Sequence, residues 1–273
     1  MITFPNAKIN LGLNVVRRRP DGYHDIETAF YPIPLTDVLE IVPAGGGETT
    51  LTCHGQTVDC PAQDNLVMRA HALMQRHYGV PPVEMHLYKH IPHGAGLGGG
   101  SSDAAHAITM LNDLFGLNRP QDELARLAAQ LGADCAFFVY NRPMLATGVG
   151  DVLSPIDVSL QGMTLLLVKP EVGVSTAQAY SRVTPAPPQT DLRQTLAMPV
   201  AAWDGWLKND FEPSVFAQIP QLLAIKTALY AMGAHYAAMS GSGSTVFGIF
   251  DNDKLSAGAT DTFADYATFV LKL

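Results

Sequence analysis

Apolar and polar side chains alternate along two stretches of the chain, and each alternation predicts a β-strand. From residue 83 to residue 91 the odd positions are mostly apolar and the even positions polar or aromatic, which is the period of a half-buried strand. Residues 8–15 alternate in the same way, with Lys8, Asn10 and Asn14 on the polar side. Because side chains two positions apart share a face, these three are predicted to point the same way. An edge strand would present the same polar face to water, so the pattern alone does not make it a site.

Helical periodicity marks three other segments. A helix is predicted to begin at Asp64, with Asp64 as the N-cap and Asn65 in the first turn. A second helix is predicted over residues 121–131, and a third over residues 222–232, ending at Gly233. Short apolar runs predict further strands at residues 38–42, 49–53, 164–168 and 246–250.

A change in composition predicts a domain boundary in the middle of the chain. The sequence loosens between residues 151 and 162, and a new apolar strand begins at Thr164. We therefore expect two domains, residues 1–155 and residues 156–273. Strand, helix and strand follow one another over residues 236–273, which predicts α+β structure in the second domain.

The stretch I-P-H-G-A-G-L-G-G-G-S-S-D-A-A at residues 91–105 is the strongest local signal in the chain. It follows a predicted strand, and apolar residues at helical spacing follow it, so a helix is expected to open at Ser101, Ser102 and Asp103. Glycines allow positive φ and close approach of the backbone to a ligand. A helix start adds unpaired N–H groups and the positive end of the helix dipole. This combination predicts a phosphate-binding loop.

Two familiar phosphate loops fit this stretch poorly. A P-loop needs a lysine after its second glycine, and Gly100 stands there instead. Residues 94–99 satisfy G-x-G-x-x-G, which is typical of dinucleotide-binding folds but weak alone. That fold needs an acidic residue after a second strand, about twenty positions on. The nearest acids, Asp122 and Glu123, fall in a predicted helix, which argues against an NAD-binding enzyme.

Composition excludes several classes of protein. With 273 residues, 47% of them hydrophobic, the chain can bury a sizeable core. Its net charge of −8 argues against general nucleic-acid binding. Cys53, Cys60 and Cys135 form no C-x-x-C pair, so a reduced interior is expected rather than a metal site. No signal-peptide pattern or membrane-length apolar run is present, and a cytoplasmic protein is predicted.

Three further features carry polar chemistry. Tyr23 and His24 follow a P-D-G turn beside the polar strand face, and turn chemistry explains the P-D-G but not these two residues. Asp134 stands directly ahead of an apolar run, where it is either a helix cap or a carboxylate held in a dry place. A second glycine-rich turn, residues 239–245, precedes a strand and favours a ligand cleft shared with the first glycine loop.

Taken in order, three motifs resemble those of the GHMP small-molecule kinases. They are A-K-I-N-L-G-L at residues 7–13, P-x-x-x-G-L-G-G-G-S-S at residues 92–102 and S-G-S-G-S-T at residues 240–245. The resemblance implies a two-domain α+β fold. Its N-terminal domain would be like the second domain of ribosomal protein S5 and its C-terminal domain ferredoxin-like, with the active site in the cleft between them.

A finer pattern narrows the resemblance to one branch of this family. It consists of R-P-D-G-Y-H-D-I-E at residues 19–27, D-N-L at residues 64–66 and G-A-D at residues 132–134. It implies phosphorylation by ATP of the 2-hydroxyl of a cytidine-diphosphate-linked polyol, in the non-mevalonate route to isoprenoids. Cys135 and Ala136 depart from the expected Val and Pro, and Asp103 stands where Asn also occurs. Neither departure falls on a residue assigned to the chemistry.

The resemblance also implies roles for individual residues. Asp134 would accept the proton of the acceptor hydroxyl, and Lys8 beside it would keep Asp134 ionised and offset charge on the phosphate. The implied ATP-binding residues are Asn65, Lys89, Pro92, His93, Gly94, Ala95, Gly96, Leu97, Gly98, Gly99, Gly100, Ser101 and Ser102. The implied substrate-binding residues are Asn10, Tyr23, His24, Thr176 and Tyr180. Ser101 and Ser102 are the candidate ligands of a Mg²⁺ ion.

Other interpretations stay open at this point. A homoserine or mevalonate type of GHMP kinase shares the loops, although Tyr23 and His24 argue against it. A nucleotide-binding regulator could have kept the fold without catalysis, although the presence of Lys8 and Asp134 argues against that. Only small-molecule partners are expected, and the chain is predicted to be a monomer or a weak homodimer.

Overall fold

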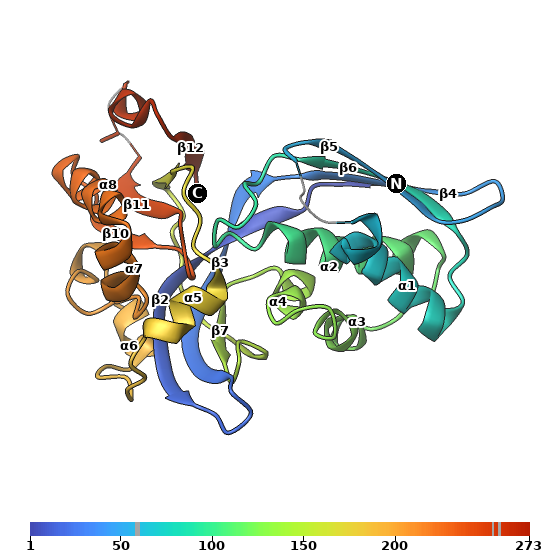
Figure 1. Ribbon diagram of the computed structural model, residues 1–273, viewed down its shortest axis with the longest axis horizontal. Coiled ribbons are helices and arrows are strands. Elements are labelled where there is room, and N and C mark those ends of the chain that lie inside the picture. Colours follow the sequence, from blue (N-terminus) through green and yellow to red (C-terminus); the bar gives the residue numbers. More distant parts are fainter. Residues whose placement is uncertain (58–60, 253, 256–257) are drawn as a thin grey trace. The chain divides into compact units, whose positions relative to one another are not determined.

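The computed structural model describes residues 1–57, 61–252, 254–255 and 258–273 (Figure 1); Cys60 lies outside them. The chain forms two compact units, neither of which is one continuous stretch. Unit 1 consists of Met1–Ala7, Leu35–His93 and Gly98–Arg142, and unit 2 of Lys8–Pro34, Gly94–Leu97 and Pro143–Leu273. The domain boundary expected at residue 155 stays a prediction. Among the described residues, none of the helices has the length and apolar character needed to cross a bilayer.

Unit 1 is a sheet with helices packed on it. The sheet order is β1 (Ile2–Thr3), β4 (Val38–Pro43), β6 (Val83–Lys89), β5 (Thr50–Gly55), and only the β5–β6 pair is parallel. Its helices are the 3-10 turn η1 (Ala62–Asp64), α1 (Leu66–Tyr78), α2 (Gly99–Leu114), α3 (Gln121–Ala128) and α4 (Cys135–Tyr140). The odd residues of β6 are buried, as its alternation predicts. Leu39, Ile41, Met85 and Leu87 of the sheet form this core together with buried residues of α1 and α2.

Two helix starts differ from the sequence-based expectation. The N-cap of α1 is Asn65, whose side chain accepts a hydrogen bond from the Val67 N–H at 2.9 Å, and Asp64 belongs to the preceding 3-10 turn. The prediction of Asp64 as the cap is therefore wrong by one residue. Helix α2 begins at Gly99, two residues before the expected serine cluster, and its N-cap residue Gly98 has a left-handed φ of 73° that glycine adopts readily.

Unit 2 contains two four-stranded sheets. In the first, the order is β2 (Asn6–Arg18), β3 (His24–Thr36), β7 (Met144–Thr147), β8 (Val152–Pro155). In the second, it is β10 (Tyr236–Met239), β11 (Val246–Asp251), β9 (Met163–Lys169), β12 (Ala267–Lys272), with antiparallel pairs throughout. The remaining elements are α5 (Thr176–Arg182), α6 (Leu192–Leu196), η2 (Val200–Ala202), α7 (Glu212–Gln218), α8 (Pro220–Ala231) and η3 (Ala259–Phe263).

One apolar cluster connects the elements of unit 2. Leu13 and Val15 of β2 belong to it, together with Phe211, Leu229 of α8 and Val246 of β11. Strand β2 is therefore fixed to the second sheet and its helices by buried contacts. This matters for function because the same strand carries the polar face of Lys8 and Asn10.

The corrected cap of α1 leads to a prediction about stability. Asn65→Ala removes the acceptor for the Val67 N–H and is expected to lower the free energy of unfolding by about 1 kcal/mol. Asp64→Ala, the matched control, leaves that bond in place and should change stability much less. Urea unfolding followed by circular dichroism measures both. Equal losses for the two variants would contradict the assignment of Asn65 as the cap.

Candidate active site

In unit 1, the start of α2 offers the features of an anion site. Gly98 is the N-cap and gives no side-chain capping bond. The first-turn N–H groups, from Gly99 onward, have no partner within the helix, and the positive end of the helix dipole lies there. Pro92 and His93 lead into the loop from the end of β6. A helix start of this kind is suited to an anion, and the phosphate binding predicted from the sequence stays a prediction.

The middle of the glycine loop, Gly94–Leu97, belongs to unit 2 and packs against the second glycine loop. The Ser240 hydroxyl donates to the Gly96 carbonyl at 2.8 Å, and the Thr245 N–H donates to the Ala95 carbonyl at 3.3 Å. Gly96 has a φ of 75°, and a Cβ there would lie 2.0 Å from the Ser240 carbonyl oxygen. Glycine at position 96 is thus required by contact between two loops, a reason that the sequence pattern did not reveal.

Lys8 and Asn10 lie on the buried polar face of β2, and each is 3% exposed. The Lys8 ammonium donates to Asn10 Oδ1 at 2.6 Å and to the Gly96 carbonyl at 3.1 Å, and it lies 5.0 Å from the centre of the Phe30 ring. Asn10 in turn donates to the Thr28 hydroxyl at 2.9 Å. The alternative of a solvated outer face is therefore excluded for these two residues. Thr28 of β3 was missed by sequence reasoning, because the sequence around it gives no polar pattern like that of residues 8–15.

His24 and Tyr180 contact each other, and their role as an aromatic wall for the substrate stays a prediction. Their rings are stacked, with centroids 4.9 Å apart and planes inclined by 19°. Tyr23, the residue before His24, is 66% exposed. Burial and the charge of Arg18 lower the pKa of His24, which favours its neutral imidazole form. The Thr176 hydroxyl is 3.3 Å from the Ser242 hydroxyl, so α5 contacts the second glycine loop.

Asp134 occupies the N-cap position of α4 but makes no side-chain capping bond. The cap interpretation that the sequence left open therefore does not describe it. The next residue, Cys135, is fully buried. Burial raises the pKa of the Cys135 thiol to about 11; a hydrogen bond with Ser101 opposes this rise, and the Asp134 charge adds to it. Cys135 is thus a buried, protonated thiol.

The two candidate magnesium ligands have different surroundings. Ser102 is fully buried, and its hydroxyl lies 3.3 Å from His106 Nδ1. Ser101 is half-buried and faces Cys135. Among the described residues, no group of three or more His, Cys, Asp or Glu side chains could hold a metal ion. The hydroxyls of Ser101 and Ser102 therefore fit only a Mg²⁺ ion held chiefly by nucleotide phosphates and water, which is how Mg²⁺ is commonly bound at nucleotide sites.

Lys89 lies inside unit 1 between two carboxylates. Its ammonium, 6% exposed, pairs with Asp37 and, at 2.7 Å, with Asp103 of α2. The other oxygen of Asp37 accepts the N–H groups of His90 and Ile91 at 2.6 and 2.8 Å, where the chain enters the glycine loop. Burial alone would lower the pKa of Lys89, and the two carboxylates more than reverse this. The structure therefore gives Lys89 a role in holding the root of the loop, and its predicted contact with the nucleotide stays a prediction.

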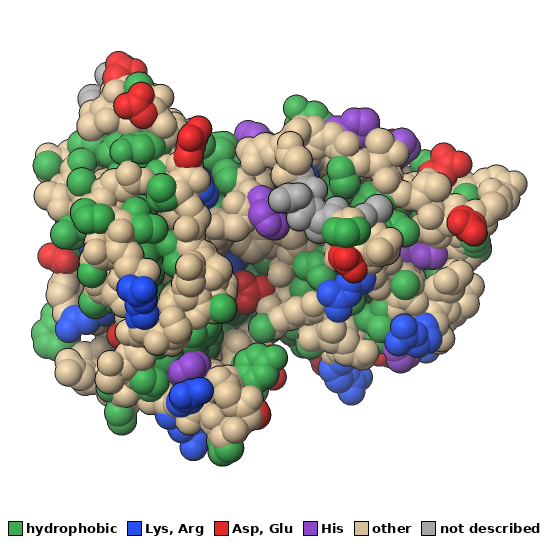
Figure 2. Space-filling model, viewed as in Figure 1, with side chains coloured by type: hydrophobic (Ala, Val, Ile, Leu, Met, Phe, Trp, Pro, Cys, Tyr) green, Lys and Arg blue, Asp and Glu red, His purple; other side chains and the backbone are tan. Residues whose placement is uncertain are grey.

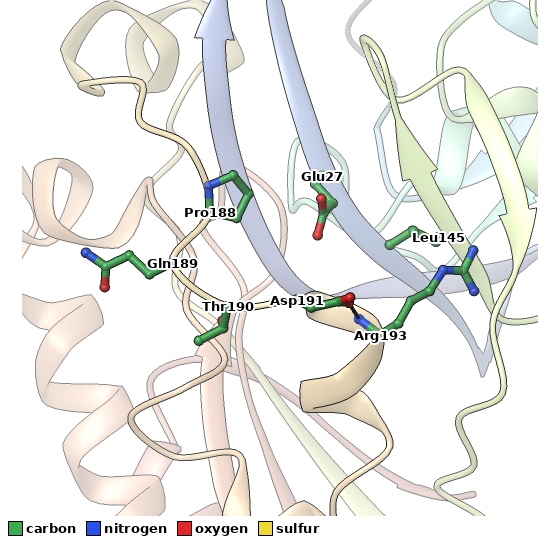
Figure 3. A pocket seen from close by; sticks show the side chains of 7 residues that line it. All are labelled: Glu27, Leu145, Pro188, Gln189, Thr190, Asp191 and Arg193. Carbon is green, nitrogen blue, oxygen red and sulfur yellow. Dashed lines mark hydrogen bonds between the residues drawn. The ribbon is translucent and has the colours of Figure 1, made fainter.

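A cavity of about 440 Å³ lies elsewhere in unit 2 (Figure 3). Two of its charged lining residues already have partners. Asp191 accepts the backbone N–H of Arg193 at 2.8 Å, and the Arg193 guanidinium donates to Pro155 and Ser154. Burial and the Asp191 charge raise the pKa of Glu27. The lining includes none of the predicted site residues and consists of Glu27, Leu145, Pro188, Gln189, Thr190, Asp191 and Arg193.

On the face shown in Figure 2, positive and negative side chains are interspersed rather than gathered by sign. The strand-end arginines pair locally, Arg17 with Asp25 and Arg19 with Asp21. The charge of Arg18, between them in the chain, contributes to the lowered pKa of His24.

Comparisons with known families match both halves of the chain. The model of the GHMP kinases N terminal domain matches residues 65–142, and that of the GHMP kinases C terminal domain matches residues 196–263. A 4-diphosphocytidyl-2-C-methyl-D-erythritol kinase from Parabacteroides distasonis is 55% identical over 251 residues, which is 92% of each chain.

Solved structures agree with these matches. A crystal structure of 4-(cytidine 5'-diphospho)-2C-methyl-D-erythritol kinase superimposes with a TM-score of 0.85 at 33% identity, covering 99% of this chain and 98% of that one. Homoserine kinase from Cytophaga hutchinsonii gives a TM-score of 0.72 at 18% identity, covering 97% and 93%. The second likeness concerns the fold alone, which both enzymes share with this α+β chain.

The Lys89 cluster leads to a prediction about pH and stability. Burial raises the pKa of Asp103 to about 7, against the attraction of Lys89, and Asp37 raises it further. The folded chain therefore keeps a proton that the unfolded chain loses near pH 4, so stability falls as the pH rises from about 4 to about 7. Asp103→Asn should remove this fall. Urea midpoints measured between pH 5 and pH 8.5 test this.

Asp113→Asn, on the exposed face of the same helix, is the matched control and should leave the pH dependence unchanged. Parallel stability curves for Asp103→Asn and the natural chain would contradict a protonated, buried Asp103.

Proposed function

The chain belongs to the GHMP kinase family, and we propose that it transfers the γ-phosphoryl group of ATP to the 2-hydroxyl of 4-diphosphocytidyl-2-C-methyl-D-erythritol. The reaction gives the 2-phosphate of this alcohol in the non-mevalonate, or methylerythritol phosphate, route of isoprenoid biosynthesis. The observation that carries the proposal is the sequence identity of 55% to a relative whose name states this activity; the match covers 92% of that relative. The family's motifs stand in this chain without a change at any residue assigned to the chemistry.

Phosphoryl transfer depends on positioning and on neutralising charge more than on covalent help. The first-turn N–H groups of α2 and the glycines before it bind the ATP phosphates through the backbone. The unit 1 part of the loop is held at its root by Asp37 and Lys89. Asn65 and Lys89 are assigned to the adenosine side by resemblance, and of these Asn65 stands at the start of α1 with its side chain capping that helix.

Asp134 is the proposed general base, which accepts the proton of the 2-hydroxyl. Its place in the family's G-A-D motif supports this role, and a carboxylate there is of the right type to accept a proton. Lys8 is proposed to offset the negative charge that develops on the transferred phosphoryl group. Its ammonium is already oriented by Asn10 and by the Gly96 carbonyl, so little reorganisation is needed when the charge appears.

A Mg²⁺ ion bridging the ATP phosphates would supply further charge neutralisation. Ser101 is the better candidate ligand, because the Ser102 hydroxyl is fully buried beside His106. Burial lowers the pKa of His106, so its neutral ring is the partner of Ser102 at physiological pH.

Recognition of the alcohol is assigned to residues of unit 2. The stacked pair of His24 and Tyr180 offers a flat surface to the cytosine ring, and the exposed Tyr23 ring is free to close on it. Asn10 and Thr176 are proposed to contact the polar part of the substrate. Cytoplasmic location and a monomer or weak homodimer stay predictions.

The substrate assignment is tested by offering the protein a panel of alcohols. We expect transfer of ³²P from [γ-³²P]ATP to 4-diphosphocytidyl-2-C-methyl-D-erythritol and not to homoserine or mevalonate, since the aromatic wall of His24 and Tyr180 suits a base that those alcohols lack. Turnover of homoserine or mevalonate with an inert cytidyl substrate would contradict the proposal. Binding of ATP without transfer to any alcohol would indicate a regulator instead.

The role of Asp134 is tested by Asp134→Asn. Loss of a general base should lower kcat by at least about 100-fold, while the affinity for ATP changes little. Asp122→Asn, an exposed acid on α3 whose carboxylate accepts the Tyr140 hydroxyl, is the matched control and should retain full activity. A kcat for Asp134→Asn close to that of the control would remove the base assignment.

A further inference from the structure

The turn at residues 209–212, N-D-F-E, contains a buried asparagine that the sequence gave no reason to single out. Asn209 is 4% exposed. Its amide nitrogen donates to the carbonyls of Met239 and Gly241, both at 2.8 Å, and its amide oxygen accepts the Phe211 N–H at 3.0 Å. Every donor and acceptor of this side chain is thus engaged. The two carbonyls that it binds are those on either side of Ser240.

The neighbouring acids fix the same turn to two other elements. Glu212 accepts the Met239 N–H at 2.8 Å and the Lys226 ammonium at 2.6 Å. Asp210 accepts the Val15 N–H at 2.7 Å, while its own N–H donates to the Leu13 carbonyl at 2.9 Å. The 209–212 turn therefore connects strand β2 to the end of β10 and the second glycine loop.

Hydrogen bonds, together with the backbone of residues 239–241, connect Asn209 to the proposed catalytic lysine. Asn209 holds both neighbours of Ser240 in the chain, and the Ser240 hydroxyl donates to the Gly96 carbonyl. The same carbonyl accepts the Lys8 ammonium at 3.1 Å. All of these groups belong to unit 2. A shift of Ser240 would move the oxygen on which the Lys8 ammonium rests.

We propose that Asn209 is a positioning residue for the phosphoryl transfer, which holds Ser240 where its hydroxyl and the Lys8 ammonium meet on the Gly96 carbonyl. The inference rests on the proposed role of Lys8. Asn209 touches neither substrate nor reacting atoms and acts through Ser240 and Gly96. Preorganised donors are effective in catalysis because they need not reorient during the reaction, and a misplaced donor loses that advantage.

The space around the loop supports a requirement for accurate placement. A Cβ at Gly241 would lie 3.3 Å from Asn10 Oδ1, so the backbone of the second loop already lies close beside the Lys8–Asn10 pair. Gly96 leaves no room for a side chain against Ser240. With such close contacts on both sides, small movements of residues 240–241 are transmitted to Lys8 and Asn10.

A double-mutant cycle tests the inference, using Asn209→Ala, Ser240→Ala and the two together. We expect each single substitution to lower kcat by about 10- to 100-fold, with KM for ATP changed less than about threefold. Because Asn209 acts through Ser240, the double variant should lose no more than the more damaged single variant. A double variant whose loss is the product of the two single losses, or an effect on KM alone, would overturn the proposal.

Hydrogen exchange followed by mass spectrometry gives a readout that does not depend on activity. Asn209→Ala should speed exchange in residues 94–97 and 240–245. Asn112→Ala is the matched control, since Asn112 is a buried asparagine of unit 1, 8% exposed, that accepts the Arg119 N–H at 2.9 Å. The control should lower the melting temperature without altering kcat or exchange in the two loops. Unchanged exchange in those loops for Asn209→Ala would overturn the proposal.

The two readouts also separate this inference from the proposed function. If the natural chain transfers no phosphate to the cytidyl alcohol, the proposed function fails, and hydrogen exchange still decides whether Asn209 holds the loops. If Asn209→Ala does not fold, Asn209→Ser, which keeps a small polar side chain, replaces it in both experiments. The expected losses are then smaller but have the same pattern.

Discussion

The carbonyl of Gly96 is the acceptor on which the positions of Lys8 and Ser240 in unit 2 depend. It accepts the Lys8 ammonium and the Ser240 hydroxyl together, and so ties strand β2 to both glycine loops. This meeting is possible only because residue 96 has a left-handed φ and no side chain. Glycine is entropically costly to order, and here the cost is offset by several hydrogen bonds made at one place. The sequence of the first glycine loop is therefore constrained by contacts within the protein as much as by its proposed ligand.

Two buried lysines are handled in contrasting ways. Lys89 lies between Asp37 and Asp103, so its charge is balanced inside unit 1 and serves the structure of the loop root. Lys8 is oriented within unit 2 by an amide oxygen, a backbone carbonyl and an aromatic face. An ammonium that is already held in place needs little reorientation when charge appears on a phosphoryl group, whereas the ammonium of Lys89 serves the structure of the loop root.

The sequence predicted what depends on neighbours along the chain. The alternation over residues 8–15 and 83–91 correctly identified two strands and placed Lys8 and Asn10 on one face, but it left open whether that face is buried or solvated. It failed where two residues of similar chemistry compete, as Asp64 and Asn65 do for one cap. It also missed side chains whose partners lie far along the chain. Asp37 and Lys89 are 52 positions apart, and Asn209 and Gly241 are 32 apart, so no local period could reveal either pair.

The interleaving of the two units has a consequence for how the chain can fold. Residues 8–34 and 94–97 are made early but belong to a unit whose remaining strands end at Lys272. Unit 1 can close once Arg142 has been made, while the strand with Lys8 and Asn10 still lacks the sheet it packs on. During synthesis the apolar side of this strand therefore stays uncovered until more than half of the chain has been made after it. A single cut after Arg142 leaves all of unit 1 on one fragment but divides unit 2 between the two fragments. The C-terminal fragment expressed alone should therefore be poorly folded and prone to aggregation.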